Sequence, residues 1–141
     1  MVRLPDGTLE AYRFIGHDGL RERVMRVVSL DHGHSWSVPE PVAHIPPEHG
    51  LWGSITALAD DEGEVHLAVM NDRFSGVFGD PPIGQPVTTT GPSKGRWIDV
   101  WHIRSSARRT RWSSPERIWE GFTGSINSMI QTSDGRIVLP F

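Results

Sequence analysis

The sequence predicts an all-β fold built from similar antiparallel units. Short runs rich in β-branched and aromatic residues alternate with turns that contain Gly, Asp or Pro along the 141 residues. Two different sequence patterns recur in the same order, as expected for a chain of repeated units. No stretch has the length and periodicity of a long amphipathic helix. These observations favour strands that are connected mainly by tight turns.

The first predicted unit contains three strands and spans residues 8–42. The run RVMRVVSL, which ends at Leu30, is β-branched and apolar, and the segment SWSVPEPV that follows the next turn carries two prolines. Proline confines a strand to the edge of a sheet because it lacks an N–H group. We expect the second, third and fourth strands of a four-stranded sheet, so the chain would begin after the first strand. The expected ranges are 8–15, 22–30 and 35–42.

The turn between the last two of these strands has the sequence SLDHGHSW, from Ser29 to Trp36. The carboxylate of Asp31 can accept hydrogen bonds from nearby backbone N–H groups, as in an Asx turn. Gly33 can adopt the positive φ that a tight reversal needs. This turn places Trp36 where its ring can fold back onto the sheet. We therefore predict a structural role for the turn.

Two further units follow along the chain. The second, 53–119, is expected to be complete, whereas the third, 124–141, is expected to contain only its first two strands. The segment 71–96 interrupts the second unit, and its Gly and Pro content predicts an irregular loop that is either functional or disordered. The expected strands are 53–60, 63–70, 97–105 and 110–119 in the second unit, and 124–133 and 136–141 in the third.

The first repeated pattern surrounds an Asp-Gly or Glu-Gly turn. GSITALADDEGEVHLAV, which begins at Gly53, aligns with GSINSMIQTSDGRIVLP, which begins at Gly124, when one residue is inserted. The N-terminal segment LPDGTLEAYR matches the latter half of both. Gly7 then takes the position of Gly63 and Gly135, so all three units are expected to contain the same turn.

The second repeated pattern is WSVPEPV, from Trp36, which matches WSSPERI, from Trp112. The segment before the second copy, SSARRTRW, keeps a Ser at position 105 but has Ala107 where the first copy has Asp. Arg109 stands where the first copy has Gly. We interpret this segment as a decayed copy of the SLDHGHSW turn. Two independent repeats in one order support the division into units.

SLDHGHSW resembles the Asp-box, or BNR repeat, of the sialidase (neuraminidase) superfamily. The pattern in that family is Ser-x-Asp-x-Gly-x-Thr-Trp, and Ser29, Asp31, Gly33 and Trp36 match it, with Ser35 in place of the Thr. In the family, the box joins the third and fourth strands of a β-propeller blade, on the face opposite the active site. The resemblance therefore implies that the box supports the fold and takes no part in catalysis.

The resemblance also implies that the three units belong to a six-bladed β-propeller. Blade one would be 8–42, blade two 53–119, and the start of blade three 124–141. About nine strands cannot close a ring that hides its sheet edges. We therefore expect the chain to be the N-terminal part of a longer protein, whose remaining blades would be its partners. The alternative is an independent two-sheet sandwich, an architecture common at this length.

The activity implied by the resemblance is the exo-hydrolysis of a terminal sialic acid, or a related acidic sugar, from glycans. The general acid/base of the family is an Asp in the loop between the second and third strands of the first blade, and Asp18, eleven residues before Ser29, matches that position. A carboxyl group there can donate the proton that a leaving glycosidic oxygen needs. The alternative is that Asp18 belongs to an exposed Asp-Gly hairpin turn. The substrate-binding candidates on the same face are Arg21, His49, Trp52, Asp72 and Arg73.

Other catalytic groups of the family are not matched in this chain. The family uses three arginines to bind the substrate carboxylate and a Tyr nucleophile with a Glu partner, and the resemblance assigns these to other parts of the propeller. Arg3 does not match the family's first arginine, and Tyr12 is assigned no catalytic role. A second functional class therefore stays open, a non-catalytic Asp-box propeller that binds a glycan or a protein through the same face.

Composition narrows the partners and cofactors. The net charge of −3 gives no basic field for nucleic acid, and the Arg-rich segment 104–111 is interpreted as a solvated edge. No apolar run is long enough to span a membrane, and no signal peptide is expected from the N-terminal residues. The absence of Cys leaves the compartment undetermined. His32, His34 and the histidines of 44–50 lack the spacing of a metal site, so neither a metal nor another cofactor is predicted.

Overall fold

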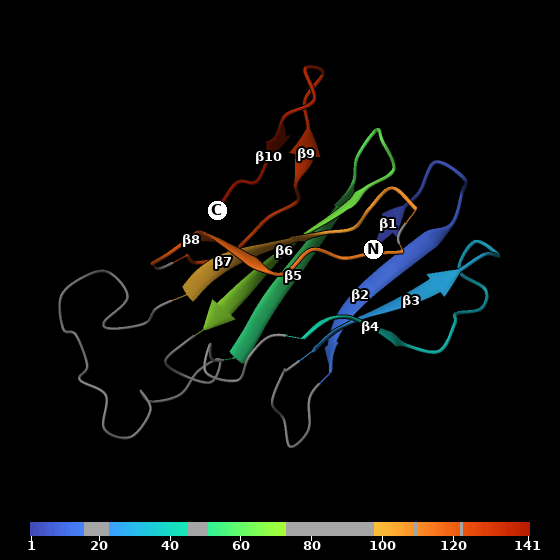
Figure 1. Cartoon of the computed structure of the whole chain (residues 1–141), viewed down its shortest axis with the longest axis horizontal. Coiled ribbons are helices and arrows are strands. Elements are labelled where there is room, and N and C mark those ends of the chain that lie inside the picture. Colours follow the sequence, from blue (N-terminus) through green and yellow to red (C-terminus); the bar gives the residue numbers. More distant parts are fainter. Residues whose placement is uncertain (16–22, 45–50, 73–97, 109, 122) are drawn as a thin grey trace.

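The computed structural model describes residues 1–15, 23–44, 51–72, 98–108, 110–121 and 123–141. Within these ranges, ten strands form three antiparallel sheets and no helix is present (Figure 1). The prediction of an all-β fold is confirmed. The described residues accordingly include no helix of the length and apolarity needed to cross a bilayer. The three described sheets do not close into a ring.

The first sheet has four strands in the order β1-β2-β3-β4. The expectation that the chain begins after the first strand of a unit was wrong, because β1 pairs with β2 through Val2↔Glu10 and Arg3↔Leu9. Only two residues long, this strand has no alternating pattern to reveal it. The fourth strand starts at Glu40 and not at residue 35, because the turn before it is longer than expected. The strands are β1 Val2–Arg3, β2 Leu9–Ile15, β3 Arg23–Ser29 and β4 Glu40–His44.

The second sheet also has four strands, in the order β5-β6-β7-β8, as predicted for a complete unit. Its last strand is shorter than the predicted 110–119. The residues before it make only an isolated bridge between Ser105 and Trp112. The strands are β5 Leu51–Ala59, β6 Val65–Asp72, β7 Ile98–Arg104 and β8 Glu116–Trp119.

The third sheet is a two-stranded hairpin of β9 Ile130–Gln131 and β10 Ile137–Val138. Both strands lie inside the predicted ranges 124–133 and 136–141, but each contributes only two paired residues. The Gly-Ser-Ile motif therefore behaves differently in its two copies. Gly53 lies within β5, whereas Gly124 precedes β9 and is outside any strand.

The same tight turn joins the first two strands of every sheet. In each copy, one backbone N–H donates a hydrogen bond to a carbonyl oxygen across the turn (Leu4 N to Thr8 O, 2.9 Å, in the first), and the glycine N–H donates back to the carbonyl at the start of the turn. The three glycines, Gly7, Gly63 and Gly135, have φ values of 89°, 81° and 82°. These values lie in the region that glycine adopts without steric cost. The predicted equivalence of the three turns is confirmed.

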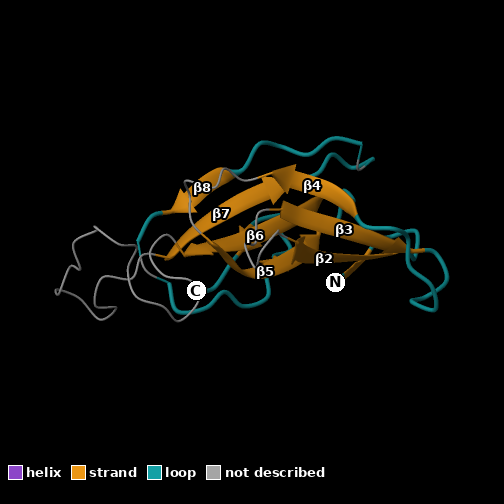
Figure 2. Ribbon diagram, turned by 90° about the horizontal axis from the view of Figure 1, so that it is seen from below, coloured by secondary structure: helices purple, strands orange, loops and turns teal. Residues whose placement is uncertain are grey.

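The core lies between the sheets, with the second sheet in the middle (Figure 1). Figure 2 shows strands of the first and second sheets from another side. Side chains alternate between the two faces of a strand. On β6, Val65, Leu67 and Val69 pack toward the first sheet, whereas Ala68 belongs to a second cluster with Met129 near the third sheet. The near-continuous apolar sequence of β6 follows from burial on both faces.

The sheets have two distinct ends, which we call the turn end and the loop end. The turn end carries the tight turns that follow β1, β3, β5, β7 and β9, seen toward the top and right of Figure 1. The loop end is where β2, β4 and β6 finish and β3, β5 and β7 begin. Pairs such as Ile15↔Arg23 and Asp72↔Ile98 fix these strand ends side by side.

Candidate functional site

The strand ends that flank the predicted site segments lie together at the loop end. Of the predicted residues, Asp18, Arg21, His49 and Arg73 lie outside the described residues. The backbones of Trp52 and Asp72 belong to β5 and β6, where they take part in the pairs Trp52↔Asn71 and Leu51↔Asp72. The structure thus places these two predicted positions on adjacent strands at the same end.

Buried polar side chains occupy this end of the second sheet. Asn71 and Asp99 face each other across β6 and β7, and both residues are 0% exposed. The amide nitrogen and oxygen of Asn71 have no hydrogen-bond partner among the described residues, and the same is true of the hydroxyl of buried Thr123. Buried polar groups in folded proteins are nearly always hydrogen-bonded. These groups therefore require partners from the adjoining segments, from water or from a ligand.

Asp99 organises the backbone that follows β8. Its Oδ1 accepts a hydrogen bond from the N–H of Gly121 at 3.2 Å, and the guanidinium of Arg117 lies 3.5 Å from Oδ2. The N–H of Ile98 donates to the carbonyl of Gly121 at 2.7 Å, which closes the same connection. Arg117 also reaches Glu120 at 3.3 Å. The end of β8 is thereby held against the start of β7.

Sequence reasoning missed Asp99 and Arg117 as members of this end. Asp99 lies in the segment WIDVWHI, for which the sequence predicts only a strand, within residues 97–105. An acidic residue between Ile98 and Val100 is an exception in an otherwise apolar strand, and that exception was the available signal. Arg117 carried no signal, because an Arg on an edge strand is ordinary. The arrangement offers amide, hydroxyl and guanidinium groups, which suit a polar, hydroxyl-bearing ligand.

At the turn end, the segment SLDHGHSW, which resembles the Asp-box, forms the predicted hydrogen-bonded turn. The carboxylate of Asp31 accepts hydrogen bonds from the hydroxyl of Ser29 (2.8 Å), from the N–H of Ser35 (2.8 Å) and from the hydroxyl of Ser35 (2.6 Å). The N–H of Gly33 donates to Ser29 Oγ at 2.8 Å. Gly33 has a φ of 93°, as expected, and His32 also adopts a positive φ, of 59°. Sequence reasoning did not anticipate this second left-handed residue.

The ring of Trp36 lies beside Gly33 of this turn, and the residue is 39% exposed. The prediction that the ring folds back onto the sheet stays a prediction. A Cβ atom at Gly33 would lie 3.9 Å from the Trp36 ring and 3.7 Å from Leu9. These are ordinary van der Waals contacts, so the φ of 93° and not the space beside Trp36 favours glycine at this position.

Replacing Asp31 by Asn is expected to remove an acid-sensitive part of the stability. Hydrogen bonds from the side chain and backbone of Ser35, then from Ser29, lower the pKa of Asp31 from 3.8 to about 2. Because the folded-state pKa is depressed, the stabilisation is complete above the ordinary pKa and is lost as the pH falls toward the folded pKa. Urea unfolding of wild type and Asp31→Asn should therefore differ at neutral pH, and the difference should shrink as the pH falls from about 4 toward about 2.

Asp61→Asn is the matched control for this experiment, since Asp61 is an exposed carboxylate in a neighbouring turn. Its stability should stay close to that of wild type at every pH. A difference between wild type and Asp31→Asn that does not change with pH would contradict the assignment.

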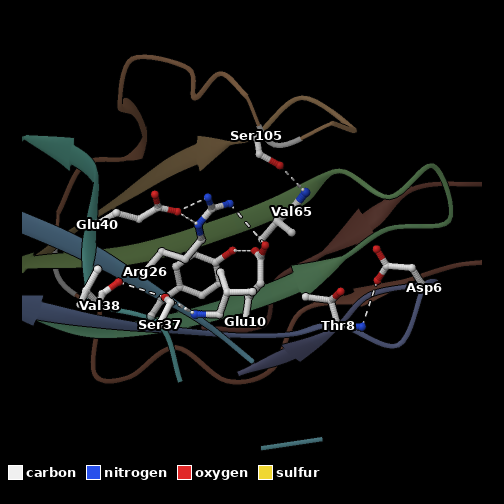
Figure 3. A network of polar contacts seen from close by, with 11 residues as sticks. Asp6, Thr8, Glu10, Arg26, Ser37, Val38, Glu40, Val65 and Ser105 are labelled. Carbon is white, nitrogen blue, oxygen red and sulfur yellow. Dashed lines mark hydrogen bonds and ion pairs between the residues drawn. The ribbon is translucent and has the colours of Figure 1, made fainter. Parts of the chain in front are cut away.

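A buried polar network crosses the first sheet near the turn end (Figure 3). Glu10 is 1% exposed and accepts a hydrogen bond from the hydroxyl of Tyr12. Arg26 lies 3.3 Å from Glu10 and donates from Nε to Glu40 at 2.6 Å. Tyr12 packs edge-on against Trp112, with 5.9 Å between ring centroids. The network joins β2, β3 and β4. Because it lies away from the loop end, we assign it a structural role.

A second polar cluster lies between the second and third sheets. His66 Nε2 is 3.2 Å from Asp60 Oδ2, and His66 Nδ1 is 3.0 Å from His102 Nε2. Burial, followed by the charge of His66, lowers the pKa of His102 below its ordinary value. Asp60, Glu64 and His66 present ligand atoms within 4.8 Å of one another, so they are the described group that could hold a metal ion. Asp60 is already occupied, because its Oδ1 accepts hydrogen bonds from the N–H groups of Glu62 and Glu64.

Comparisons with known proteins provide no relative for this arrangement. No protein-family model matches the chain, and no curated protein matches it. The inferences that follow therefore depend on the residues and their geometry.

Proposed function

We propose that this chain forms blades of an Asp-box β-propeller whose loop end hydrolyses a terminal sialic acid, or a related acidic sugar, from glycans. The observation that carries the proposal is the Asp-box itself, in which Ser29, Asp31, Gly33 and Ser35 make a complete hydrogen-bonded turn between the third and fourth strands of a sheet. This is the position that the box occupies in a propeller blade of the sialidase type.

The repetition of the sheet supports the blade assignment. The first and second sheets are both four-stranded meanders, and a β-bulge interrupts the pairing of the third and fourth strands at corresponding sites, Val24/Met25 and Val100/Trp101. A repeated irregularity of this kind favours two copies of one structural unit, since bulges are conserved features. Hydrophobic packing of both faces of the second sheet is also what a blade between two neighbours needs.

The proposed catalytic group is Asp18, in the segment between Ile15 and Arg23. The backbone pair Ile15↔Arg23 brings the two ends of that segment together at the loop end. A carboxylic acid here would protonate the glycosidic oxygen as the bond to the sugar breaks. The polar groups of Asn71 and Arg117 would contribute to binding or positioning at the same end. The arginines and the nucleophile that the family uses are assigned to no residue of this chain.

The direct test is an activity assay of the purified full-length protein. Incubation with α-linked sialosides should release free sialic acid, measured by chromatography. Neutral glycosides of the same aglycone serve as the control and should stay intact. Binding of sialylated glycans without release of sugar would instead identify the non-catalytic propeller. Neither binding nor hydrolysis of any acidic glycan would refute the proposal.

A further inference from the structure

The turn between β7 and β8 is a structural copy of the Asp-box turn. In the first sheet, Ser37 N donates to Val28 O at 2.8 Å and Val28 N donates to Ser37 Oγ at 3.0 Å. In the second sheet, Ser113 N donates to Arg104 O at 2.8 Å and Arg104 N donates to Ser113 Oγ at 3.0 Å. Corresponding residues are separated by 76 positions throughout, and the bulges named above follow the same offset.

This correspondence shows what the second turn has lost. Ala107 stands where Asp31 provides the carboxylate of the box, so the second turn has no internal anion. Ser105 corresponds to Ser29, but its hydroxyl accepts a hydrogen bond from the N–H of Val65 at 2.9 Å and is directed away from the box arrangement. The second turn therefore keeps the backbone frame of the box without the negative charge at its centre.

The correspondence also shows what the second turn has gained. Each turn has a cavity beside it, of about 300 Å³ in the first sheet and about 250 Å³ in the second, lined by the same five equivalent positions. Three of these positions change character. With the 76-residue offset, Arg104 corresponds to Val28, Ser106 to Leu30 and Arg111 to Ser35. An apolar cavity in the first turn has become a cationic one in the second.

Part of the polar lining of this cavity is uncommitted, whereas the hydroxyls of Ser105 and Ser113 already accept hydrogen bonds from the backbone. The hydroxyl of Ser106 is buried and has no hydrogen-bond partner among the described residues. Arg104 is 62% exposed and meets one carboxylate, Glu64, at the long distance of 3.9 Å. Glu64 also lines the cavity, so two arginines and one carboxylate contribute charge to its lining. Arg108, exposed in the same turn, adds to the positive charge.

We propose that this cavity binds an oxyanion, the sulfate, phosphate or carboxylate group of a ligand. Guanidinium groups bind such anions through paired, charge-assisted hydrogen bonds. Arg104 and Arg111 would bind the anion while the hydroxyl of Ser106 donates a further hydrogen bond. The anion supplies from outside the kind of charge that Asp31 supplies within the first turn. The site lies at the turn end and is independent of the function proposed for the loop end.

The test measures binding of inorganic sulfate, inorganic phosphate and acetate to the full-length protein by calorimetry at constant ionic strength. Saturable binding with a Kd of the order of millimolar is expected for a few charge-assisted hydrogen bonds on an exposed turn. Arg111→Gln should weaken binding by about tenfold or more, since it removes one of the two guanidinium groups. A preference for sulfate and phosphate over acetate would indicate a sulfated or phosphorylated ligand, and the reverse a carboxylate ligand.

The matched control is Arg136→Gln, because Arg136 is an exposed Arg in another tight turn at the same end, with an 82% exposed side chain. This variant should bind the anion as wild type does. Ser106→Ala, which removes the hydroxyl, and Ala107→Asp, which adds the missing carboxylate, should also weaken binding. These two variants test the proposal if Arg111→Gln does not fold. The proposal is overturned if no anion binds saturably, or if folded Arg111→Gln, Ser106→Ala and Ala107→Asp all bind as tightly as Arg136→Gln.

Discussion

Replacing Leu67 by Ala is expected to lower the free energy of unfolding by about 2–5 kcal/mol, the range found for such truncations in well-packed cores. Leu67 is 0% exposed and lies in the middle of β6, within the cluster that joins the first and second sheets. The substitution removes buried apolar surface and leaves a cavity, because neighbours on two sheets cannot move independently to fill it. Denaturant unfolding followed by far-ultraviolet circular dichroism measures the change.

Ile118→Ala is the control for this prediction. Like Leu67, Ile118 is a branched aliphatic residue on a strand of the second sheet, but it is 48% exposed. Its truncation should change the free energy of unfolding by about 1 kcal/mol or less. Equal effects of the two substitutions would mean that the first and second sheets do not pack against each other in solution as they do in the structure.

The sequence predicted those parts of the fold that depend on local turn chemistry. Gly7, Gly63 and Gly135 each follow an acidic residue, and a glycine after an acidic residue marks a tight turn because few other residues adopt a positive φ. The strands on either side follow almost automatically, since an antiparallel chain reverses at each turn. The equivalence of Trp36 and Trp112 was also predicted from local sequence, because the segments WSVPEPV and WSSPERI share one pattern.

Strands that depend on partners far along the chain were harder to predict. Val2–Arg3 forms a strand because β2 offers it unpaired backbone groups, and two residues carry no pattern of their own. The reverse error occurred at Gly124, where a match to Gly53 suggested a long strand. In the structure, strand pairing in that region is limited to Ile130–Gln131 and its partner, although the N–H of Asn127 also donates to the carbonyl of Pro140 at 3.3 Å. At Gly124, therefore, the repeat alignment predicted an equivalent residue but not its hydrogen-bond partners.

The candidate site shows a related limit. Asp99 and Asn71 lie 28 positions apart, and only the register of β6 with β7 makes them neighbours. The network of Glu10, Tyr12 and Arg26 was not predicted, because each of these polar residues alone is typical of the exposed face of a strand. By contrast, Asp31 was assigned correctly, since all of its partners lie within four residues. Local spacing reveals local hydrogen bonds, and pairing across a sheet must be seen in three dimensions.

Asp18→Asn in the full-length protein is expected to lower kcat/KM on natural sialoside linkages by about 10²–10⁴-fold, the usual contribution of general acid catalysis. This prediction rests on the proposed function. The amide keeps the size of the carboxyl group and its ability to accept hydrogen bonds, but it cannot deliver a proton to the leaving oxygen. An aryl sialoside whose leaving group is a weak base needs little protonation, so its hydrolysis should be affected far less.

The comparison of the two substrates separates catalysis from folding. Asp134→Asn, in the tight turn between β9 and β10, removes a carboxylate at the opposite end of the sheets and should leave both activities close to wild type. Loss of activity on the natural linkage alone, together with a flatter pH profile of kcat/KM, would identify Asp18 as the general acid. If Asp18→Asn lost both activities equally, the carboxylate would be needed for binding or folding, and the general acid would have to be sought at another residue of the loop end.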